Sequence, residues 1–455
     1  MEDPNYWNDK ILRRRLSRRR VIQLSALGTL GAITAAAVGC GGEEKASPTA
    51  GPASPAATGT PKSTATAGTP INQIFGSGGP AAGQGTTFEL GGLLALSGAG
   101  SFYGISARRG IDLAVKHIKA AGGPDISILY KDHKSGDPTT GVSAARELGA
   151  TDKVSALQCD YAALDGAILP VIDQFKILTL DGSGGTTIAH TGEPFFWGTR
   201  MITPDNFFAG AFGYLRRELP NAKNVVSLYW DVPVLKDKTK SIAKQAMDKF
   251  GFTQVSEETV TLGTNDFSAT MARVKDANPD VINLVIYTPD AGYFMKQFAL
   301  SGMNAQVMGY EYTTDSAQIA GDAYNKLWFA AEIFDADNPK DPWSKFFVDS
   351  FKQEYGEPAG FYSANNYENT FVIWELIKRV LAKKGDLSSG EQLQTALVDN
   401  PTFTSLYGGS SSAPGKMTFD LTQHTVIKEM LVATIQGGKP VVQGKIDLDG
   451  NVQAA

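Results

Sequence analysis

The chain of 455 residues has few of the side chains that form covalent cross-links or metal centres, with only 2 cysteines and 4 histidines. Cys40 lies in an N-terminal segment typical of export signals, so Cys159 is alone in the remainder. This excludes an internal disulfide framework and a cysteine-held zinc or iron–sulfur site. The histidines form no HxH, HxxxH or HExxH group, and Gly182-Ser183-Gly184 lacks the GxSxG spacing of a hydrolase nucleophile. We therefore expect no metal, no cofactor and no enzymatic activity.

Positive charge is also scarce in most of the chain. The sequence has 42 Lys and Arg against 47 Asp and Glu, a net charge of −5. Residues 1–39 hold seven of the basic and three of the acidic residues, which leaves 35 against 44, or −9, in the remainder. Because nucleic-acid binding depends on neutralising phosphates, an acidic body is a poor match for it. We expect no nucleic-acid partner.

The N-terminus has the order of features of a secretory signal. Residues 13–20 read RRRLSRRR, and an apolar run of 18 residues rich in Ala and Gly follows over 21–38. A charged start, an apolar stretch and small residues at a cleavage site are typical of a signal peptide, which we assign to residues 1–39. The alternative is an uncleaved transmembrane anchor, although this run is at the lower limit for spanning a bilayer. Both interpretations place the folded body outside the cytoplasm.

Two short motifs refine this assignment. Arg18 and Arg19 lie in the sequence SRRRVI, which resembles the twin-arginine export motif. The residues AVGC that end at Cys40 resemble a lipoprotein box, with Ala where Leu is commoner. The resemblance implies cleavage before Cys40, lipidation of that cysteine, and a lipid-anchored protein exported by the twin-arginine route.

Residues 41–85 lack the apolar side chains from which a core is built, because 35 of these 45 residues are Gly, Ala, Ser, Thr or Pro. Such a segment cannot offset the entropy cost of becoming ordered. We therefore assign residues 40–85 to a lipidated cysteine and a flexible tether, which would hold the body roughly 35–40 Å from the membrane.

From Thr87 onward, apolar runs of strand type alternate with segments of helical periodicity, which predicts βαβ units and parallel sheets. The expected strands are residues 87–96, 126–130, 154–158, 177–180, 224–230, 255–262 and 280–287, and the expected helices are 106–121, 139–149, 164–174, 236–250, 266–277 and 291–300. A helix start at residues 203–205 opens the second of two α/β lobes of similar size. In such sheets ligands bind beyond the carboxyl ends of the strands.

The loops of both lobes carry a series of short motifs. They are LSG at residues 96–98, YG at 103–104, YKD at 130–132, FWGTR at 196–200, NDFS at 265–268, NPD at 278–280 and MGYE at 308–311. In this order they resemble the leucine/isoleucine/valine-binding family, whose members are extracytoplasmic solute-binding proteins of ABC importers. The resemblance covers nearly all of residues 86–450. It implies an α/β, type I periplasmic-binding fold, in which two Rossmann-like lobes with parallel-sheet cores are joined by a three-stranded hinge.

The resemblance also implies where the chain passes between the lobes. Crossings near Arg200, Ile333 and Lys416 give a first lobe of residues 86–200 plus 334–415 and a second lobe of residues 201–333 plus 416–455. The ligand would lie in the hinge cleft, and the lobes would close on it. The implied function is capture of a small solute and its delivery to a membrane permease and ATPase complex.

Two residues of the implied second lobe match an amine-binding pair of the family. Glu311 in MGYE stands where the family has a glutamate that holds the ligand ammonium, and Tyr287 in YTPD stands 24 residues earlier, where it has a tyrosine. A carboxylate facing a bound cation in a dry cleft forms a strong charge-assisted bond, and a tyrosine face adds a cation–π contact. The alternative for Glu311 is an ordinary surface carboxylate.

The first lobe is implied to supply the other contacts. Tyr103 stands where the family places an aromatic ring over the ligand. Backbone N–H groups and hydroxyls near helix N-termini would hold a ligand carboxylate. The residues concerned are Tyr161, Ala162 and Ala163 in one loop and Gly182, Ser183, Gly184 and Thr186 in another. Ala163 replaces a family serine and DVPVL at 231–235 lacks a Tyr-Gly pair, which weakens the case for a branched-chain amino acid and leaves an amino acid or other small amine-bearing solute.

Two other functions stay open at this point. A ligand-sensing receptor of the same fold, without transport, would use the same cleft. A dinucleotide-dependent enzyme is a more remote alternative, because GAG at 98–100 with Gly104 spells GxGxxxG after a strand and Asp132 ends the next strand. An exported protein would have little access to a soluble nicotinamide, so we favour the solute-binding function.

Overall fold

The computed structural model describes residues 70–76, 78–182, 192–200, 204–332, 334, 336–426, 430–446 and 451–454. All of them belong to one compact unit, Ala65–Ala455. Several predictions therefore fall outside the described residues: the signal peptide with Arg18 and Arg19, the lipidation site Cys40 with the tether up to residue 69, the second crossing at Ile333, and Ser183, Gly184 and Thr186 of the predicted carboxylate-binding loop.

The first sheet, which defines the first lobe, has the strand order β11-β12-β13-β5-β4-β3-β1-β2. Neighbouring strands among β1 to β5 run parallel, whereas β11 and β12 pair antiparallel. The strands are β1 (Thr87–Leu94), β2 (Asp125–Asp132), β3 (Ala156–Cys159), β4 (Leu178–Asp181), β5 (Phe196–Gly198), β11 (Thr402–Ser410), β12 (Ala413–Asp420) and β13 (Thr425–Val426). The helices are α2 (Pro70–Phe75), α3 (Ser101–Ala120), α4 (Pro138–Ala150), α5 (Ala162–Phe175), α12 (Pro342–Tyr355), α13 (Phe361–Ala382) and α14 (Gly390–Asp399), with a 3-10 turn η1 (Pro80–Ala82).

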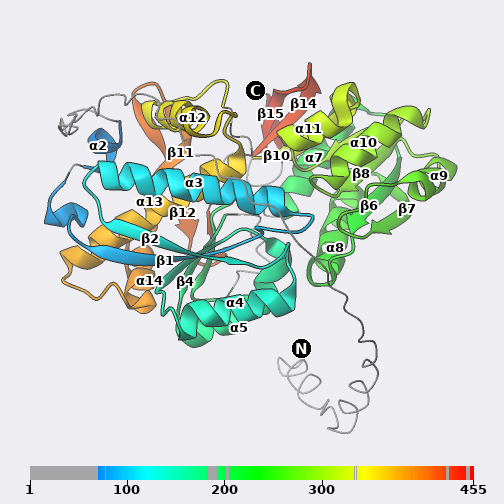
Figure 1. The fold of residues 1–455 in the computed structure, drawn as a ribbon. Helices are drawn as coiled ribbons and strands as arrows, with labels where there is room; N and C mark the ends of the chain where they lie inside the picture. Colours follow the sequence, from blue (N-terminus) through cyan, green and yellow to red (C-terminus); the bar gives the residue numbers. More distant parts are fainter. Residues whose placement is uncertain are drawn as a thin grey trace, which may run out of the picture. The chain divides into compact units, whose positions relative to one another are not determined.

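The second sheet, which defines the second lobe, has the order β16-β15-β14-β10-β9-β8-β6-β7, with a parallel core from β7 to β10. The strands are β6 (Asn224–Trp230), β7 (Thr253–Val260), β8 (Val281–Val285), β9 (Gln306–Gly309), β10 (Leu327–Ala331), β14 (Met430–Gln436), β15 (Lys439–Ile446) and β16 (Val452–Ala454). The helices are α7 (Pro204–Glu218), α8 (Pro233–Lys249), α9 (Ser268–Asp276), α10 (Asp290–Leu300) and α11 (Thr314–Ala320), followed by η2 (Gly321–Lys326). The prediction of two α/β lobes with parallel cores is confirmed (Figure 1).

The order of the strands takes the chain from one sheet to the other three times. The passages lie between β5 and α7, between β10 and α12, and between β13 and β14. Arg200 lies in the first of these connections. Lys416 was predicted to mark the third crossing, but it lies within β12 of the first sheet, where its register partner is Thr404 of β11. The chain stays in the first lobe through Val426 because the β11–β12 hairpin and β13 extend that sheet beyond β5.

The start of the first lobe corrects the predicted tether. Ile71 and Phe75 of α2 are buried, and the Phe75 ring lies 4.9 Å from that of Trp343 and 4.7 Å from that of Phe371, centroid to centroid. The flexible segment predicted to reach Gly85 is therefore wrong from Pro70 onward. The prediction rested on the composition of the whole segment and overlooked three apolar side chains, Ile71, Ile74 and Phe75. Burial of their apolar surface stabilises α2 against the first lobe.

The packing of α3 on α13 positions the residues that matter below. The two helices lie side by side on one face of the first sheet, and α4 and α5 cover the other face (Figure 1). Gly110 allows this approach, because a Cβ there would lie 2.2 Å from the Ser363 carbonyl oxygen. Gly104 likewise lets α3 approach the end of β1, since its Cβ would lie 2.3 Å from the Ala95 carbonyl oxygen. The first turns of α3 and α13 are thus brought together at the carboxyl end of the sheet.

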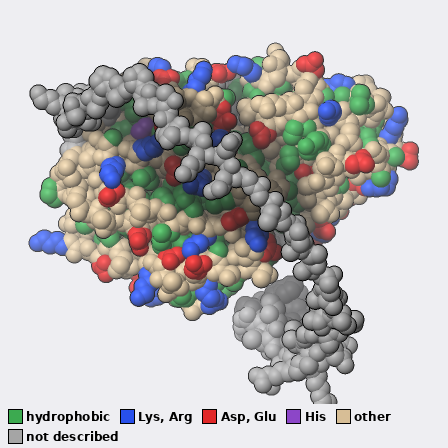
Figure 2. All heavy atoms as spheres, viewed as in Figure 1, with side chains coloured by type: hydrophobic (Ala, Val, Ile, Leu, Met, Phe, Trp, Pro, Cys, Tyr) green, Lys and Arg blue, Asp and Glu red, His purple; other side chains and the backbone are tan. Residues whose placement is uncertain are grey.

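The surface shows neither sign of charge in excess on the face drawn in Figure 2, where acidic and basic side chains are interspersed. Within the described part of the chain, every helix is too short or too polar to cross a membrane.

Candidate functional site

The carboxyl ends of the parallel strands of both lobes meet at one cluster of aromatic side chains. Tyr103 and Tyr161 follow β1 and β3, and Phe361 and Tyr362 begin α13. From the second lobe, Leu262 and Tyr287 pack against them. Loops at these strand ends are where α/β sheets bind ligands, and the cluster combines side chains from both lobes. We take it as the candidate site.

Glu311, which follows β9, is the acidic centre of this cluster. Its side chain is 5% exposed. Oε1 accepts hydrogen bonds from the Thr288 backbone N–H at 3.1 Å and from the Thr288 hydroxyl at 2.8 Å. Burial raises the pKa of Glu311, and the nearby charge of Arg200 and these hydrogen bonds oppose that rise only in part. The interpretation of Glu311 as a surface carboxylate is therefore wrong.

Two tyrosine hydroxyls of the first lobe donate to the same carboxylate. The Tyr103 hydroxyl lies 3.2 Å from Glu311 Oε1 and 3.1 Å from the Thr288 carbonyl oxygen. The Tyr362 hydroxyl lies 3.4 Å from Glu311 Oε2. Burial raises the pKa of Tyr103 and of Tyr362, so both remain hydroxyl donors. These bonds cross from the first lobe to the second and hold the two together.

A buried cation lies on the hinge side of the tyrosines. Arg200 is 2% exposed, its Nε lies 2.9 Å from Glu332 Oε1, and its Nη1 donates to the Tyr362 hydroxyl at 3.0 Å. Its guanidinium carbon lies 4.5 Å from the centre of the Phe361 ring. Burial works against the charge of Arg200, but Tyr362, Glu332 and Glu311 outweigh it and raise its pKa. Glu332, Arg200, Tyr362 and Glu311 therefore form one continuous polar chain through the hinge.

The predicted loop at the start of α5 contributes a ring and small side chains. Tyr161 is buried, its ring centre lies 5.9 Å from that of Tyr103, and Ala163 packs beside it. Among the described residues, nothing accepts from or donates to the Tyr161 hydroxyl. Ala162 is the first residue of α5. Gly182, at the end of β4, lies against α13, where a Cβ would be 2.8 Å from Asn366 Nδ2.

The YTPD segment supplies a ring and a second carboxylate. Tyr287 is half-buried, and its ring centre lies 5.3 Å from that of Trp230. Asp290 is buried, and its Oδ2 accepts from Trp230 Nε1 at 2.8 Å and from the backbone N–H groups of Gly263 and Thr264. Burial raises its pKa. Asp290 also acts electrostatically on Tyr161 of the first lobe, so it lies at the same junction.

The structure brings Tyr103, Tyr161, Tyr287 and Glu311 together and places Ala162, Ala163 and Gly182 on the loops beside them. The site residues that were not predicted include Arg200, Thr288, Asp290 and Tyr362. Three of these had a signal in the sequence, because Arg200 ends the FWGTR motif and Thr288 and Asp290 belong to YTPD. Tyr362 had none, since only the packing of α13 on α3 brings it to the cleft.

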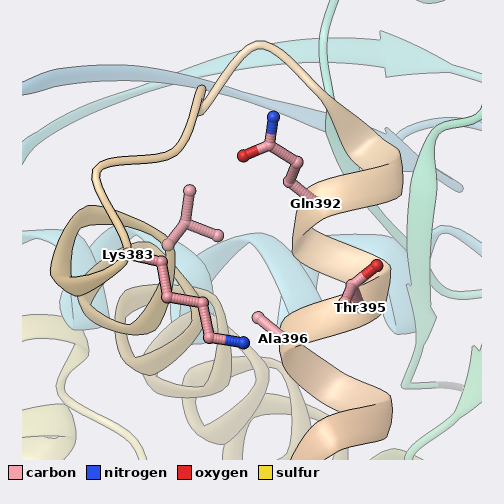
Figure 3. Close-up of a pocket in the computed structure, with 5 residues that line it drawn as sticks. Lys383, Gln392, Thr395 and Ala396 are labelled. Atoms are coloured by element: carbon pink, nitrogen blue, oxygen red, sulfur yellow. The ribbon is translucent and has the colours of Figure 1, made fainter.

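A separate recess lies on the first lobe, between α13 and α14. It has a volume of about 100 Å³ and is lined by Val380, Lys383, Gln392, Thr395 and Ala396 (Figure 3). Lys383 is paired with Asp399, and the Gln392 side chain accepts from the Asp386 backbone. Its polar groups are engaged with the protein, so we do not count it as part of the site.

Comparison with known proteins gives a consistent result. A family model described as Periplasmic binding protein matches residues 87–439. The Leu/Ile/Val-binding protein homolog 6 of Brucella abortus (strain 2308) is 25% identical over 301 residues, which cover 63% of this chain and 75% of that protein.

Two solved structures share the fold. LivJ from Streptococcus pneumoniae, a branched-chain amino acid transporter substrate binding protein in complex with isoleucine, has a TM-score of 0.66 at 23% identity and covers 81% of this chain and 100% of its own. A solute binding protein of an ABC transporter from R. palustris, in complex with benzoate, has a TM-score of 0.69 at 19% identity and covers 81% of this chain and 98% of its own. The predicted periplasmic-binding fold is confirmed.

Proposed function

Because the chain belongs to the periplasmic binding protein family, we propose that it is the extracytoplasmic solute-binding protein of an ABC importer, specific for an amino acid or another small amine-bearing solute. The observation that carries this proposal is Glu311, a buried carboxylate of the second lobe that accepts hydrogen bonds from Tyr103 and Tyr362 of the first. A carboxylate in this position favours a cationic group of the solute at the junction of the lobes.

The charges around Glu311 support an amine. Asp290 is a second buried carboxylate of the same lobe, and one of its oxygens has no hydrogen-bond partner among the described residues. The positive charge of Arg200 is already matched by Glu332. An ammonium would therefore enter a region of negative potential, where tyrosine faces add cation–π attraction.

The first lobe would hold the other end of the solute. The Tyr161 hydroxyl is a buried donor, and the first backbone N–H groups of α5, at Ala162 and Ala163, have no carbonyl partner within the helix. A solute carboxylate would be favoured at this helix N-terminus. Gly182, Ser183, Gly184 and Thr186 would complete that end of the site.

The bonds from Tyr103 to Thr288 and Glu311 describe how the lobes would close. They form between residues of different lobes, so they are made only when the lobes approach each other. A solute that contacts both lobes would favour the closed state by its differential affinity. The closed form would be what the permease recognises, with the protein held at the membrane through a lipidated Cys40 after twin-arginine export. A sensing receptor without a permease is the alternative.

The function is tested by isothermal titration calorimetry of the purified protein with amino acids, other amines, organic acids and aromatic carboxylates. We expect binding of one amine class, weakened by Glu311→Gln and unchanged by Asp322→Asn, which alters an exposed carboxylate of the same lobe. Binding of the same amine by Glu311→Gln with wild-type affinity would refute the assignment. Co-purification with a permease complex would separate transport from sensing.

A second solute class is favoured by the aromatic rings at the site. Phe361 and Tyr362 flank the buried Arg200, an arrangement that would suit an aromatic carboxylate. The R. palustris structure that shares this fold holds benzoate. The two classes respond to Glu311→Gln with opposite signs, because removal of a negative charge weakens an amine and strengthens an anion.

A further inference from the structure

A second group of buried acidic side chains lies in the first lobe, on the other face of the sheet from α13. Cys159 ends β3 and Asp181 ends β4, and the two are direct register partners in the parallel pair. Asp165, in the first turn of α5, faces them. The Sγ of Cys159 and one oxygen of each carboxylate all lie within 4.8 Å of one another. This spacing is small enough for one cation to contact all three atoms.

Asp165 is the member of the group whose burial is not balanced by hydrogen bonds from the described residues. It is 0% exposed, and among the described residues no donor reaches either of its carboxylate oxygens. A buried carboxylate normally accepts several hydrogen bonds, as Glu311 does. Asp165 instead directs an oxygen toward Cys159 and Asp181. A cation beside the Asp165 carboxylate would therefore stabilise it.

Among the described residues, no positive charge acts on Asp165. His133 lies beside Asp160, with its Nε2 2.9 Å from Asp160 Oδ1. The Gly136 backbone N–H lies 2.9 Å from His133 Nδ1, so both ring nitrogens of His133 have partners outside the group. The charges that act on Asp165 are those of Asp181 and Asp160, both negative, and with burial they raise its pKa. Two carboxylates this close repel each other when both are charged, and a cation between them offsets that repulsion.

We propose that Cys159, Asp165 and Asp181 form a buried binding site for one divalent transition-metal ion of the zinc class. The donor set decides the class. A thiolate disfavours Mg²⁺ and Ca²⁺, which take oxygen ligands, and suits Zn²⁺, which binds Cys sulfur at about 2.3 Å and carboxylate oxygen at about 2.0–2.2 Å. From the sequence we excluded a metal site held by several cysteines, because Cys159 is alone in the folded body. That prediction did not consider carboxylates that the fold brings next to Cys159.

The binding reaction balances without an oxidant or reductant. Burial raises the pKa of both Cys159 and Asp165, which favours their protonated forms in the metal-free group. Binding of the ion releases the thiol proton and the carboxyl proton to solvent. The ion would fix the loop from Asp160 to Ala163 beside the solute site. The site stands independently of the proposed solute.

The test is a titration of the chelator-treated, full-length protein with Co²⁺ and Zn²⁺. Co²⁺ serves as a spectroscopic probe, because a thiolate ligand gives a charge-transfer band that oxygen ligands do not. We expect one Co²⁺ per chain with this band, displacement by Zn²⁺, and no displacement by Mg²⁺. Asp165→Asn should weaken binding at least 10- to 100-fold, the loss that removal of an outer-shell partner alone can cause. Cys159→Ser should abolish the band.

Asp173→Asn is the matched control, because Asp173 is an exposed carboxylate of the same helix. It should bind Co²⁺ as the wild type does. Wild-type protein that binds Co²⁺ without a thiolate band, or not at all, would overturn the proposal. Retention of the band and affinity in Asp165→Asn would also overturn it. The wild-type spectrum decides the matter even where a variant fails to fold.

Discussion

Two buried carboxylates in the two lobes differ in how their charge is accommodated. Glu311 in the second lobe accepts hydrogen bonds from Thr288, Tyr103 and Tyr362 and lies near Arg200. Asp165 in the first lobe is equally inaccessible, but no donor among the described residues reaches it. Hydroxyl groups of Thr288, Tyr103 and Tyr362 donate to Glu311, and a solute donor can replace these hydrogen bonds one at a time. Asp165 is suited instead to a single strongly held cation or proton.

The largest expected effect comes from removing the cation on the Glu311 side. Arg200→Met leaves Glu332 buried without its ion pair, with the Asn365 amide as its hydrogen-bond donor. Loss of one partner of a buried pair costs about 3–5 kcal/mol in the free energy of unfolding. Urea denaturation measures this loss. The exposed pair of Arg217 and Glu218 gives the control, since Arg217→Met should change stability by less than about 1 kcal/mol. Equal effects of the two variants would contradict a buried ion pair at the hinge.

Removing the charge of Glu311 comes next. Glu311→Gln keeps the shape of the side chain but loses the charge-assisted bond to a solute amine, worth on the order of 2–4 kcal/mol in a dry cleft. Calorimetry should show affinity for the true amine reduced by roughly 30- to 1,000-fold. A rise in affinity for a carboxylate would instead assign the site to anions.

The pH dependence of the free energy of unfolding should differ between the wild type and Asp165→Asn, in which the side chain keeps its shape but cannot ionise. Because the folded-state pKa of Asp165 is raised, its contribution to stability is full below the unfolded pKa of about 3.9 and is lost as pH rises through the folded value. Without metal, the free energy of unfolding of the wild type should therefore fall relative to that of Asp165→Asn as pH rises from about 4 to 8. Denaturation at both pH values, with Asp173→Asn beside them, checks the sign. A pH-independent difference between wild type and Asp165→Asn would show that Asp165 is not a buried ionising group.

The smallest effect is expected at the bond between the lobes. Tyr103→Phe removes the hydroxyl that reaches Glu311 and Thr288 but keeps the ring. A hydrogen bond of this kind contributes about 1 kcal/mol net, so the closed state should lose roughly fivefold in population. Small-angle scattering without and with the solute measures the shift. An unchanged radius of gyration in both conditions would argue against Tyr103 as a closing contact.

Local periodicity in the sequence was enough to locate most of the secondary structure. The strand at Asn224–Trp230 was predicted to the residue, and the start of α7 at Pro204 was anticipated from the Thr-Pro-Asp run. Composition over long windows was less reliable, because it missed α2, whose six residues include two buried apolar ones. The third crossing was misplaced, since nothing in the hairpin β11–β12 marks which of two sheets it joins.

Some residues of the candidate site could be found from the sequence, and others could not. Motif order pointed to Tyr103, Tyr161, Tyr287 and Glu311. Tyr103 lies in the first turn of the helix that follows β1, and the other three lie in loops directly after strands, where parallel sheets gather their functional groups. Tyr362 and Glu332 could not be found this way. They reach the site through helix packing and a hinge connection far along the chain.

The sequence by itself determined the two α/β lobes, the loops that carry the site and the acidic character of the chain, because each follows from local periodicity, strand ends or counting. Only the tertiary structure decided which charges are compensated. It placed Arg200 between Glu332 and Tyr362, and it brought Asp165 against Cys159 and Asp181 without a cation among the described neighbours. The physical reason is that burial and electrostatic pairing depend on distances across the fold, which a linear spacing does not contain.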